Sequence, residues 1–504
     1  MIMKNGIVYF VGAGPGDPGL LTIKGKQALE EADVILYDRL ANPRLLEFAS
    51  PDCQFIYCGK LPDRHFMKQK EINALLVEKA LNGSTVVRLK GGDPSVFGRV
   101  GEEADALHEH GIRYEMVPGI TSGIAAPLYA GIPVTHRDFA SSFAMITAHD
   151  KSLKGTPNLD WEGLARSVQT LVFYMGVKNL SYICQQLISY GKSPSVPVIV
   201  IQWGTWGRQR SVKGTLENIQ QKVQEHQITN PAIIVIGDIV NFQTHSWFES
   251  KPLIGRHMMI VTHGEDEDPL ADRLRDSGAD VIEWPKWRTE NMPVNEDILR
   301  KIGSFEDILF TSRRAVCEFF KALASKKIDI RQLTARLSAA TEQAKAELEK
   351  RGFLVTAIQP DSEKRLVVGS RPAVENVQTH ESSSFYITHE NVIDDRFTHM
   401  IQRTISESPL HMVICPNKLS VQQLISNGQQ IGISPEPSAS RLPIVCIGDD
   451  SAAGAYGFTA VQAQDELFAF IHNQQAEKNS FTADGKQPFS SRAVLFMHQF
   501  FMMG

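Results

Sequence analysis

The chain has 504 residues, more than one hydrophobic core usually organises, so its length predicts about two or three domains. Its net charge of −5 gives no general attraction to nucleic acid or to an anionic membrane, and no apolar run is long enough to span a bilayer. The six cysteines are scattered without a CxxC pair, so we expect neither a metal site nor a disulfide framework. These features predict a cytoplasmic protein that binds no nucleic acid and no membrane.

The first elements form a βαβ unit with a glycine-rich turn. A strand over residues 7–11 runs into GAGPGDPG at residues 12–19, Thr22 can cap a helix, and a strand over residues 34–37 ends at Asp38. A dinucleotide site is the first alternative for such a unit. It fails here because Asp17 stands where GxGxxG needs its third glycine, and because the prolines of the turn remove backbone donors.

Further strands predict a shared edge where a ligand can sit. The strand over residues 55–58 ends in Gly59 and Lys60, and the strand over residues 85–89 runs into Gly91, Gly92 and Asp93. Carboxyl ends of parallel strands meet at one edge of a sheet, so we expect these residues to lie near Asp38. The alternative for Lys60 is a solvated surface lysine, and the alternative for residues 91–93 is a plain strand-to-helix turn.

The rest of the chain repeats the pattern. Apolar strands are expected over residues 143–147, 170–174, 198–202 and 233–236, and after a linker the βαβ pattern restarts at residues 258–262. The predicted organisation is a first domain over residues 1–246, a linker over 247–256, a second domain over 257–473 and a tail over 474–504 that has no clear place in either core.

A series of sequence blocks, in order, resembles the tetrapyrrole methylase family and within it the uroporphyrinogen-III C-methyltransferases. The resemblance implies S-adenosylmethionine held between two α/β lobes, and methylation of uroporphyrinogen III at ring carbons C2 and C7 to precorrin-2, on the routes to sirohaem and cobalamin. It also implies a homodimer. The blocks lie at residues 12–19, 37–40, 59–60, 87–99, 117–127, 130–138, 170–177 and 231–240.

The resemblance implies a role for individual residues at the predicted edge. Asp38 falls on the family's proton acceptor and Lys60 on its proton donor. Arg39, Arg99 and Arg137 are candidate cations for the carboxylates of the substrate. The family's cofactor contacts fall on Pro15, Gly91, Gly92, Asp93, Val96, Thr121, Ser122, Met175 and Gly204.

The second domain resembles uroporphyrinogen-III synthase, which closes hydroxymethylbilane into uroporphyrinogen III. The resemblance rests on residues 310–312, 341–344 and 446–453. The sequence departs from that family at residues 262–264, where Thr-His-Gly replaces Thr-Arg-Pro, and at residues 414–417, expected to be a strand of the second lobe. The expected fold class is therefore α/β: a two-lobed methylase fold followed by a two-lobed synthase-like domain.

The sequence leaves two alternatives open. The first domain could methylate a later precorrin, because relatives share the fold and the cofactor turns. The blocks at residues 37–40 and 135–138 favour uroporphyrinogen III over that substrate. The second domain could be a non-catalytic module that only binds the tetrapyrrole.

Overall fold

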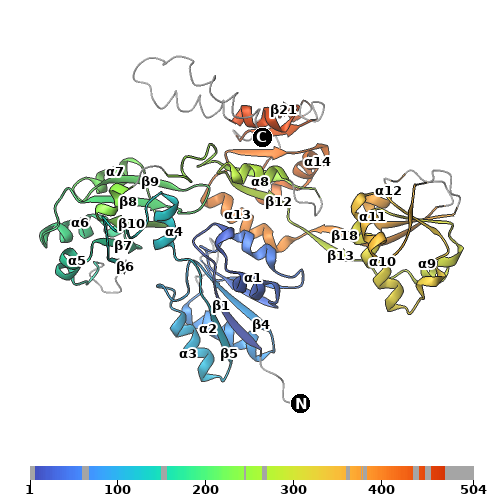
Figure 1. Cartoon of the computed structure of the whole chain (residues 1–504), viewed down its shortest axis with the longest axis horizontal. Helices are drawn as coiled ribbons and strands as arrows, with labels where there is room; N and C mark the ends of the chain where they lie inside the picture. The colour runs from blue at the N-terminus through green and yellow to red at the C-terminus, as the bar shows by residue number, and fades with distance from the viewer. Residues whose placement is uncertain are drawn as a thin grey trace.

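The computed structural model describes residues 6–59, 67–148, 156–242, 246–263, 269–358, 364–375, 377, 383–434, 442–448, 454 and 456–471. Within these residues the strands form four sheets, each with helices packed around it (Figure 1). The α/β class expected from the sequence is confirmed. The expected tail lies outside the described residues.

The first sheet is entirely parallel, in the order β3-β2-β4-β1-β5. Its central strands are mostly buried because helices cover both faces, and β4 carries two charged residues, Arg88 and Lys90, inside this buried layer. Thr22 caps the first helix as expected, accepting a hydrogen bond from the Gly25 amide at 3.1 Å. The elements are β1 (Ile7–Gly12), α1 (Ile23–Glu30), β2 (Val34–Tyr37), β3 (Gln54–Tyr57), α2 (Gln69–Leu81), β4 (Thr85–Lys90), α3 (Val100–Glu109) and β5 (Arg113–Val117).

The second sheet is mixed, in the order β6-β7-β10-β8-β9, with only β6 and β7 parallel. Helix α4 (Ser122–Tyr129) begins at the edge of the first sheet, and its Ala126 packs on the apolar face of the second. The helix therefore joins the two lobes of the first domain. The remaining elements are β6 (Phe143–Thr147), α5 (Trp161–Ser167), β7 (Thr170–Tyr174), α6 (Leu180–Ser189), β8 (Pro197–Gln202), β9 (Arg210–Thr215), α7 (Ile219–Glu225) and β10 (Ala232–Ile236).

The third sheet is parallel, in the order β12-β11-β19-β20-β21, and draws on two distant parts of the chain. The expected linker before it packs Trp247 and Phe248 against Tyr129 of α4, with ring centroids 4.8 Å apart in both pairs. Its elements are β11 (His257–Val261), α8 (Pro269–Asp276), β12 (Asp280–Trp284), α13 (Thr398–Glu407), β19 (Met412–Cys415), α14 (Lys418–Asn427), β20 (Ile444–Ile447) and β21 (Thr459–Val461).

The fourth sheet is a lobe inserted between β12 and α13. The chain enters it through β13 and returns through β18, and this antiparallel pair of strands bridges the two lobes (Figure 1). The sheet order is β13-β18-β17-β14-β15-β16. The elements are β13 (Trp287–Asn291), α9 (Glu296–Arg300), β14 (Asp307–Phe310), α10 (Arg313–Ser325), β15 (Arg336–Ala339), α11 (Glu342–Lys350), β16 (Val355–Thr356), β17 (Arg365–Ser370), α12 (Arg371–Glu375) and β18 (Ser384–Ile393).

One expectation about this domain is wrong. The strand at residues 414–417 was expected in the second lobe, but β19 pairs in parallel with β11 and belongs to the sheet that opens the domain. The second lobe is instead the inserted segment that carries residues 310–312. Apolar runs reveal that strands exist, but chain order does not reveal which strands pair.

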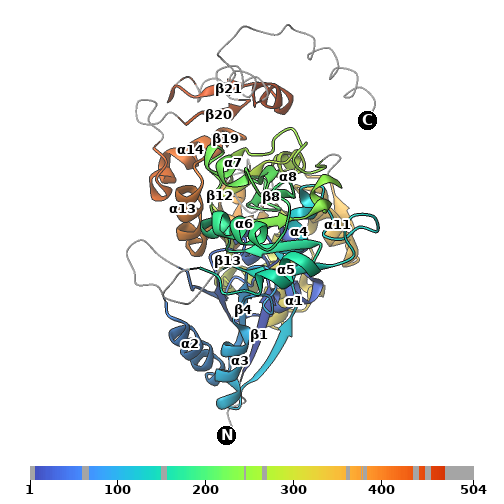
Figure 2. The ribbon, with the colours of Figure 1, turned by 90° about the vertical axis from the view of Figure 1, so that its left-hand side faces the viewer.

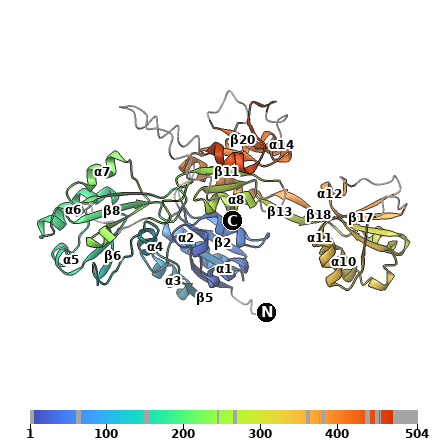
Figure 3. The same ribbon diagram turned by 45° about the horizontal axis from the view of Figure 1, so that its top comes forward.

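The bodies around the first and third sheets share one hydrophobic core. Buried Val11 and Leu45 on one side belong to the same cluster as Met259 and Trp284 on the other. The Phe55 and Phe397 rings meet edge to face at 5.5 Å across the junction. Figure 2 shows these bodies stacked along the molecule, and Figure 3 shows the second and fourth sheets at opposite ends.

None of the helices in the described part of the chain has the length and apolar character of a membrane span.

Candidate active site

Three turns meet backbone to backbone at the carboxyl edge of the first sheet. Gly14 and Gly92 exchange two hydrogen bonds, at 3.1 Å and 2.8 Å between amide nitrogen and carbonyl oxygen. A Cβ on Gly119 would lie 2.4 Å from the Gly92 carbonyl oxygen and 2.8 Å from the Gly12 Cα. Only glycine permits this approach, so the edge carries a bare backbone surface.

Asp93 holds two of these turns together. One carboxylate oxygen accepts a hydrogen bond from the Ser95 amide at 2.8 Å, and the other accepts one from the Gly119 amide at 3.0 Å. The residue was expected to contact a ligand. In the structure its carboxylate organises the floor of the site through protein donors.

Asp38 stands at the end of β2 and is held by a buried ionic network. The Arg88 guanidinium donates to Asp38 at 2.6 Å and to Glu103 at 3.2 Å, and the Lys90 ammonium donates to both oxygens of Glu103 at 2.9 Å. Arg88, Lys90 and Glu103 are almost wholly buried, whereas the Asp38 side chain is 33% exposed. The network therefore presents one oriented carboxylate to solvent.

Charge balance inside this network follows from burial and pairing. Burial opposes the charge of Arg88, but Asp38 and Glu103 outweigh it and raise the pKa of the guanidinium. Burial, reinforced by Arg88, lowers the pKa of Lys90. Glu103 lies between the two cations, and together with Asp38 it balances their two positive charges.

Tyr174, at the end of β7, ties the second lobe to this edge. Its hydroxyl lies 2.7 Å from the Thr121 Oγ1 and accepts a hydrogen bond from the Gly123 amide at 2.8 Å. Burial raises the pKa of Tyr174, which keeps the hydroxyl protonated. The next residue, Met175, has a left-handed backbone with φ 56° and an exposed side chain, a combination typical of functional turns.

Trp206, two residues after the predicted cofactor contact Gly204, contacts Pro15, which is another predicted cofactor contact. The Trp206 indole donates to the Pro15 carbonyl oxygen at 3.2 Å. A Cβ on Gly204 would lie 2.2 Å from the Ala126 Cβ of α4, so this glycine is required for close packing between turn and helix.

The predicted substrate contacts, three arginines, lie in separate parts of the first domain. Arg39 donates to Glu407 of α13 at 3.0 Å, and Arg99 donates to Glu102 at 2.8 Å. Arg137 is exposed in the segment between α4 and β6. The predicted proton donor, Lys60, lies outside the described residues, as do residues 449–453 of the synthase-like markers.

Sequence reasoning missed Glu103 as the partner of the buried cations. A signal was present, because Val100, Ala104 and Leu107 place one apolar face of α3 inward and Glu103 stands on that face. A charged residue at such a position needs a buried partner. Tyr174 and Trp206 had no comparable signal, because aromatic residues are common at strand ends, where Tyr174 lies, and in the loops that follow strands, where Trp206 lies.

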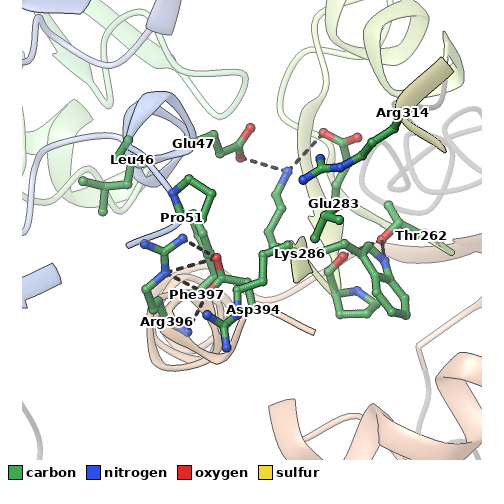
Figure 4. A pocket seen from close by; sticks show the side chains of 15 residues that line it. Leu46, Glu47, Pro51, Thr262, Glu283, Lys286, Arg314, Asp394, Arg396 and Phe397 are labelled. Carbon is green, nitrogen blue, oxygen red and sulfur yellow. Dashed lines mark hydrogen bonds and ion pairs between the residues drawn. The ribbon is translucent and has the colours of Figure 1, made fainter. Parts of the chain in front are cut away.

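A separate cavity of about 370 Å³ lies where the first domain meets both lobes of the second (Figure 4). Lys286 reaches into it between Glu47 at 2.8 Å and Glu283 at 3.5 Å. Arg396 pairs with Asp394 at 2.6 Å on the opposite wall. The lining residues are Leu46, Glu47, Ala49, Pro51, Thr262, Glu283, Pro285, Lys286, Trp287, Arg288, Thr289, Arg314, Asp394, Arg396 and Phe397.

Comparisons with known proteins match both domains. The family model of tetrapyrrole (corrin/porphyrin) methylases matches residues 7–220, and that of uroporphyrinogen-III synthase HemD matches residues 268–369. A uroporphyrinogen-III C-methyltransferase of Bacillus subtilis (strain 168) is 94% identical over 478 residues, which is 95% of this chain and 99% of the relative.

Two further matches cover parts of the chain. Porphyrin biosynthesis protein HemD of Ruminiclostridium josui is 40% identical over 66% of this chain and 66% of its own. The crystal structure of uroporphyrin-III C-methyl transferase from Thermus thermophilus, complexed with S-adenyl homocysteine, is 42% identical over 47% of this chain and 99% of its own, with a TM-score of 0.40.

Proposed function

The chain belongs to the uroporphyrinogen-III C-methyltransferases of the tetrapyrrole methylase family, and from this premise we propose that it methylates uroporphyrinogen III at C2 and C7 to precorrin-2. The methyl donor is S-adenosylmethionine, and the product feeds sirohaem or cobalamin synthesis. The observation that carries the proposal is that the glycine turns and the oriented carboxylate of Asp38 lie at one sheet edge.

Methyl transfer requires two things of the protein: alignment of the substrate with the methyl donor, and removal of a proton from the substrate ring. The sulfonium charge of the donor already activates the methyl group, so the site must bring an electron-rich pyrrole carbon in line with it. A ring proton must then leave, and Asp38 is the proposed acceptor because its carboxylate is partly exposed and fixed by Arg88. Lys60 is the proposed proton donor.

The bare backbone of the glycine turns suits the donor. Pro15, Gly91 and Gly92 are the proposed backbone contacts for its polar groups. Thr121 stands at the start of α4 on the same edge, and Met175 follows β7 in the second lobe. Asp93, Val96, Ser122 and Gly204 complete the proposed donor site. Arg39, Arg99 and Arg137 are the proposed partners of the substrate carboxylates, and a homodimer is the proposed assembly.

The test is methyl counting by mass spectrometry. The full chain is incubated with S-adenosylmethionine and either uroporphyrinogen III or precorrin-2. Two added methyl groups on uroporphyrinogen III are expected. Methylation of precorrin-2, with uroporphyrinogen III left unchanged, would instead establish the alternative of a later precorrin substrate.

A second activity is proposed for the synthase-like domain. The cavity around Lys286 is large enough for part of a linear tetrapyrrole, and Arg288, Arg314 and Arg396 supply further cations for its carboxylates. Ring closure to uroporphyrinogen III is a task of positioning a flexible chain. Supplied with hydroxymethylbilane, the chain should form the type III isomer; only the spontaneous type I isomer would make this domain a binding module.

A further inference from the structure

One loop stands between the proposed donor site and the synthase-like domain. We call residues 203–208 the tryptophan loop; it follows β8 in the second lobe. One side of the loop contacts the glycine-rich turn at residues 12–19. The Trp206 indole donates to the Pro15 carbonyl oxygen at 3.2 Å, and the Asp17 amide donates to the Thr205 hydroxyl at 3.0 Å. A Cβ on Gly16 would lie 2.0 Å from the Trp206 indole nitrogen, so the two segments are in close contact.

The other side of the tryptophan loop contacts the end of the linker and the second domain. The Gly255 amide donates to the Gly207 carbonyl oxygen at 2.6 Å. A Cβ on Gly207 would lie 2.4 Å from the backbone nitrogen of Asp280, the first residue of β12. Arg208 pairs with the Asp280 carboxylate, with 3.4 Å between nitrogen and oxygen.

The Arg208 guanidinium joins the two sides. It lies 3.9 Å from the centre of the Trp203 ring and 4.6 Å from that of Trp206, and the residue is 9% exposed. Burial lowers the pKa of Arg208, and the carboxylates of Asp280 and, to a smaller extent, Glu407 oppose that effect. Contacts therefore run without a gap from Asp280 through Arg208 and Trp206 to Pro15.

The loop is also held in an unfavourable backbone conformation. Trp203 and Thr205 have φ angles of 49° and 71°, in the left-handed region that residues with side chains rarely adopt. Such conformations persist only where the surroundings impose them. The surroundings here include the second domain, which supplies Asp280.

We propose that the Arg208–Asp280 pair couples the domains, so that the synthase-like domain holds the tryptophan loop in the shape the donor site needs. This inference rests on the proposed function, which places S-adenosylmethionine against Pro15 and Gly204. Because coupling is reciprocal, bound donor also strengthens the contact between the domains. Arg208 and Asp280 are positioning residues, since neither touches the reacting atoms.

The test uses the full chain with Asp280→Asn, which keeps the size of the side chain and removes its charge. The affinity for S-adenosylhomocysteine, measured by titration calorimetry, should fall about fivefold or more. The KM for S-adenosylmethionine should rise by a similar factor with little change in kcat. The control is Arg403→Gln, which removes a guanidinium lying 4.3 Å from the Tyr57 ring centre across the same interface, and its affinity should stay at the wild-type value.

A second variant separates positioning from folding. Arg208→Lys keeps the charge but loses the planar group that stacks on both indoles. Its effect on affinity should not add to that of Asp280→Asn, because both changes break the same connection. In the wild type, S-adenosylhomocysteine should slow hydrogen exchange of the Asp280 amide, which donates to the Arg256 carbonyl oxygen at 2.7 Å, and in Arg208→Lys it should slow it less.

The outcomes discriminate between the two proposals. A wild type that binds S-adenosylhomocysteine, with both variants at wild-type affinity, would overturn the coupling and leave the proposed function intact. A wild type that binds neither S-adenosylhomocysteine nor S-adenosylmethionine would overturn both. A loss of affinity in Arg403→Gln equal to that in Asp280→Asn would also overturn the coupling, because any damage to the interface would then suffice.

Discussion

Arg88 shows how a single residue links the core to the chemistry. It lies in β4 between apolar neighbours, and a buried guanidinium is tolerated there only because Glu103 and Asp38 accept its hydrogen bonds. The planar fork of arginine can serve two carboxylates at once, which a lysine ammonium does with less fixed geometry. The stability of the sheet and the orientation of Asp38 therefore depend on the same side chain.

Removing the charge of Glu103 should destabilise the first domain strongly. Glu103→Gln leaves Arg88 and Lys90 buried without a full counter-charge, and loss of one partner of a buried ion pair costs about 3 to 5 kcal/mol. Urea denaturation followed by circular dichroism measures this loss. The matched control is Glu102→Gln, one position earlier in α3, where an exposed pair with Arg99 contributes at most about 1 kcal/mol. Equal losses in the two variants would contradict the role of the buried network.

At the scale of elements, the site is made where three turns converge. The turns after β1, β4 and β5 belong to parallel strands that end at one edge, and glycine allows their backbones to touch. Each turn alone is an ordinary strand-to-helix connection. Their mutual contact creates the surface on which a ligand can lie.

Gly119→Ala should therefore separate the turns. The new Cβ would meet the Gly92 carbonyl oxygen at 2.4 Å, so one backbone must move, and we expect the affinity for S-adenosylhomocysteine to fall at least about tenfold. Titration calorimetry measures it. Gly101→Ala in α3 is the control, because a Cβ there meets nothing within 4 Å and should slightly stabilise the helix. Unchanged affinity in Gly119→Ala would show that the contact between the turns is not needed for binding.

Strand β18 carries a pH-sensitive residue between the two lobes of the second domain. Burial, assisted by Arg314, lowers the pKa of His389 to about 4, against about 6.5 in an unfolded chain. Between pH 6.5 and pH 4 the unfolded chain therefore protonates His389 while the folded chain keeps it neutral, which favours unfolding. The folded state has its full stability with respect to this residue above pH 6.5 and loses stability as the pH falls towards 4.

The melting temperature of the second domain should accordingly decrease from pH 7 to pH 5, and His389→Gln should flatten that decrease. The contribution at stake is about 2 to 3 kcal/mol at most. Differential scanning calorimetry at the two pH values measures it. A variant with the same pH dependence as the wild type would assign the effect to other groups.

At the scale of the whole molecule, most strands could be predicted from the sequence, but their assembly could not. The expected ranges for β6 and β7 match the structure, because their apolar runs are bounded by polar residues. The edge strand β9 was missed because, apart from Val212, its residues are polar or small. The pairing of β19 with β11 depends on contacts between distant segments, which periodicity does not encode.

The candidate site likewise has parts that the sequence predicts and parts that it does not. Glycine turns and Asp38 are visible in the sequence because local chemistry requires them. The buried role of Glu103 and the junction between Arg208 and Asp280 come from packing between elements. The shared core of the first and third sheets likewise makes two sequence domains into one packed unit.

The central claim is that methyl transfer takes place at the carboxyl edge of the first sheet, with Asp38 as the proton acceptor. The most direct measurement compares wild type and Asp38→Asn in single-turnover methylation of uroporphyrinogen III, with S-adenosylhomocysteine affinity measured in parallel. The predicted result is unchanged affinity and a rate lower by about 10² to 10⁴, the usual contribution of a positioned base. A rate near that of the wild type would contradict the claim, and a loss of affinity would mean that Asp38 binds the donor instead.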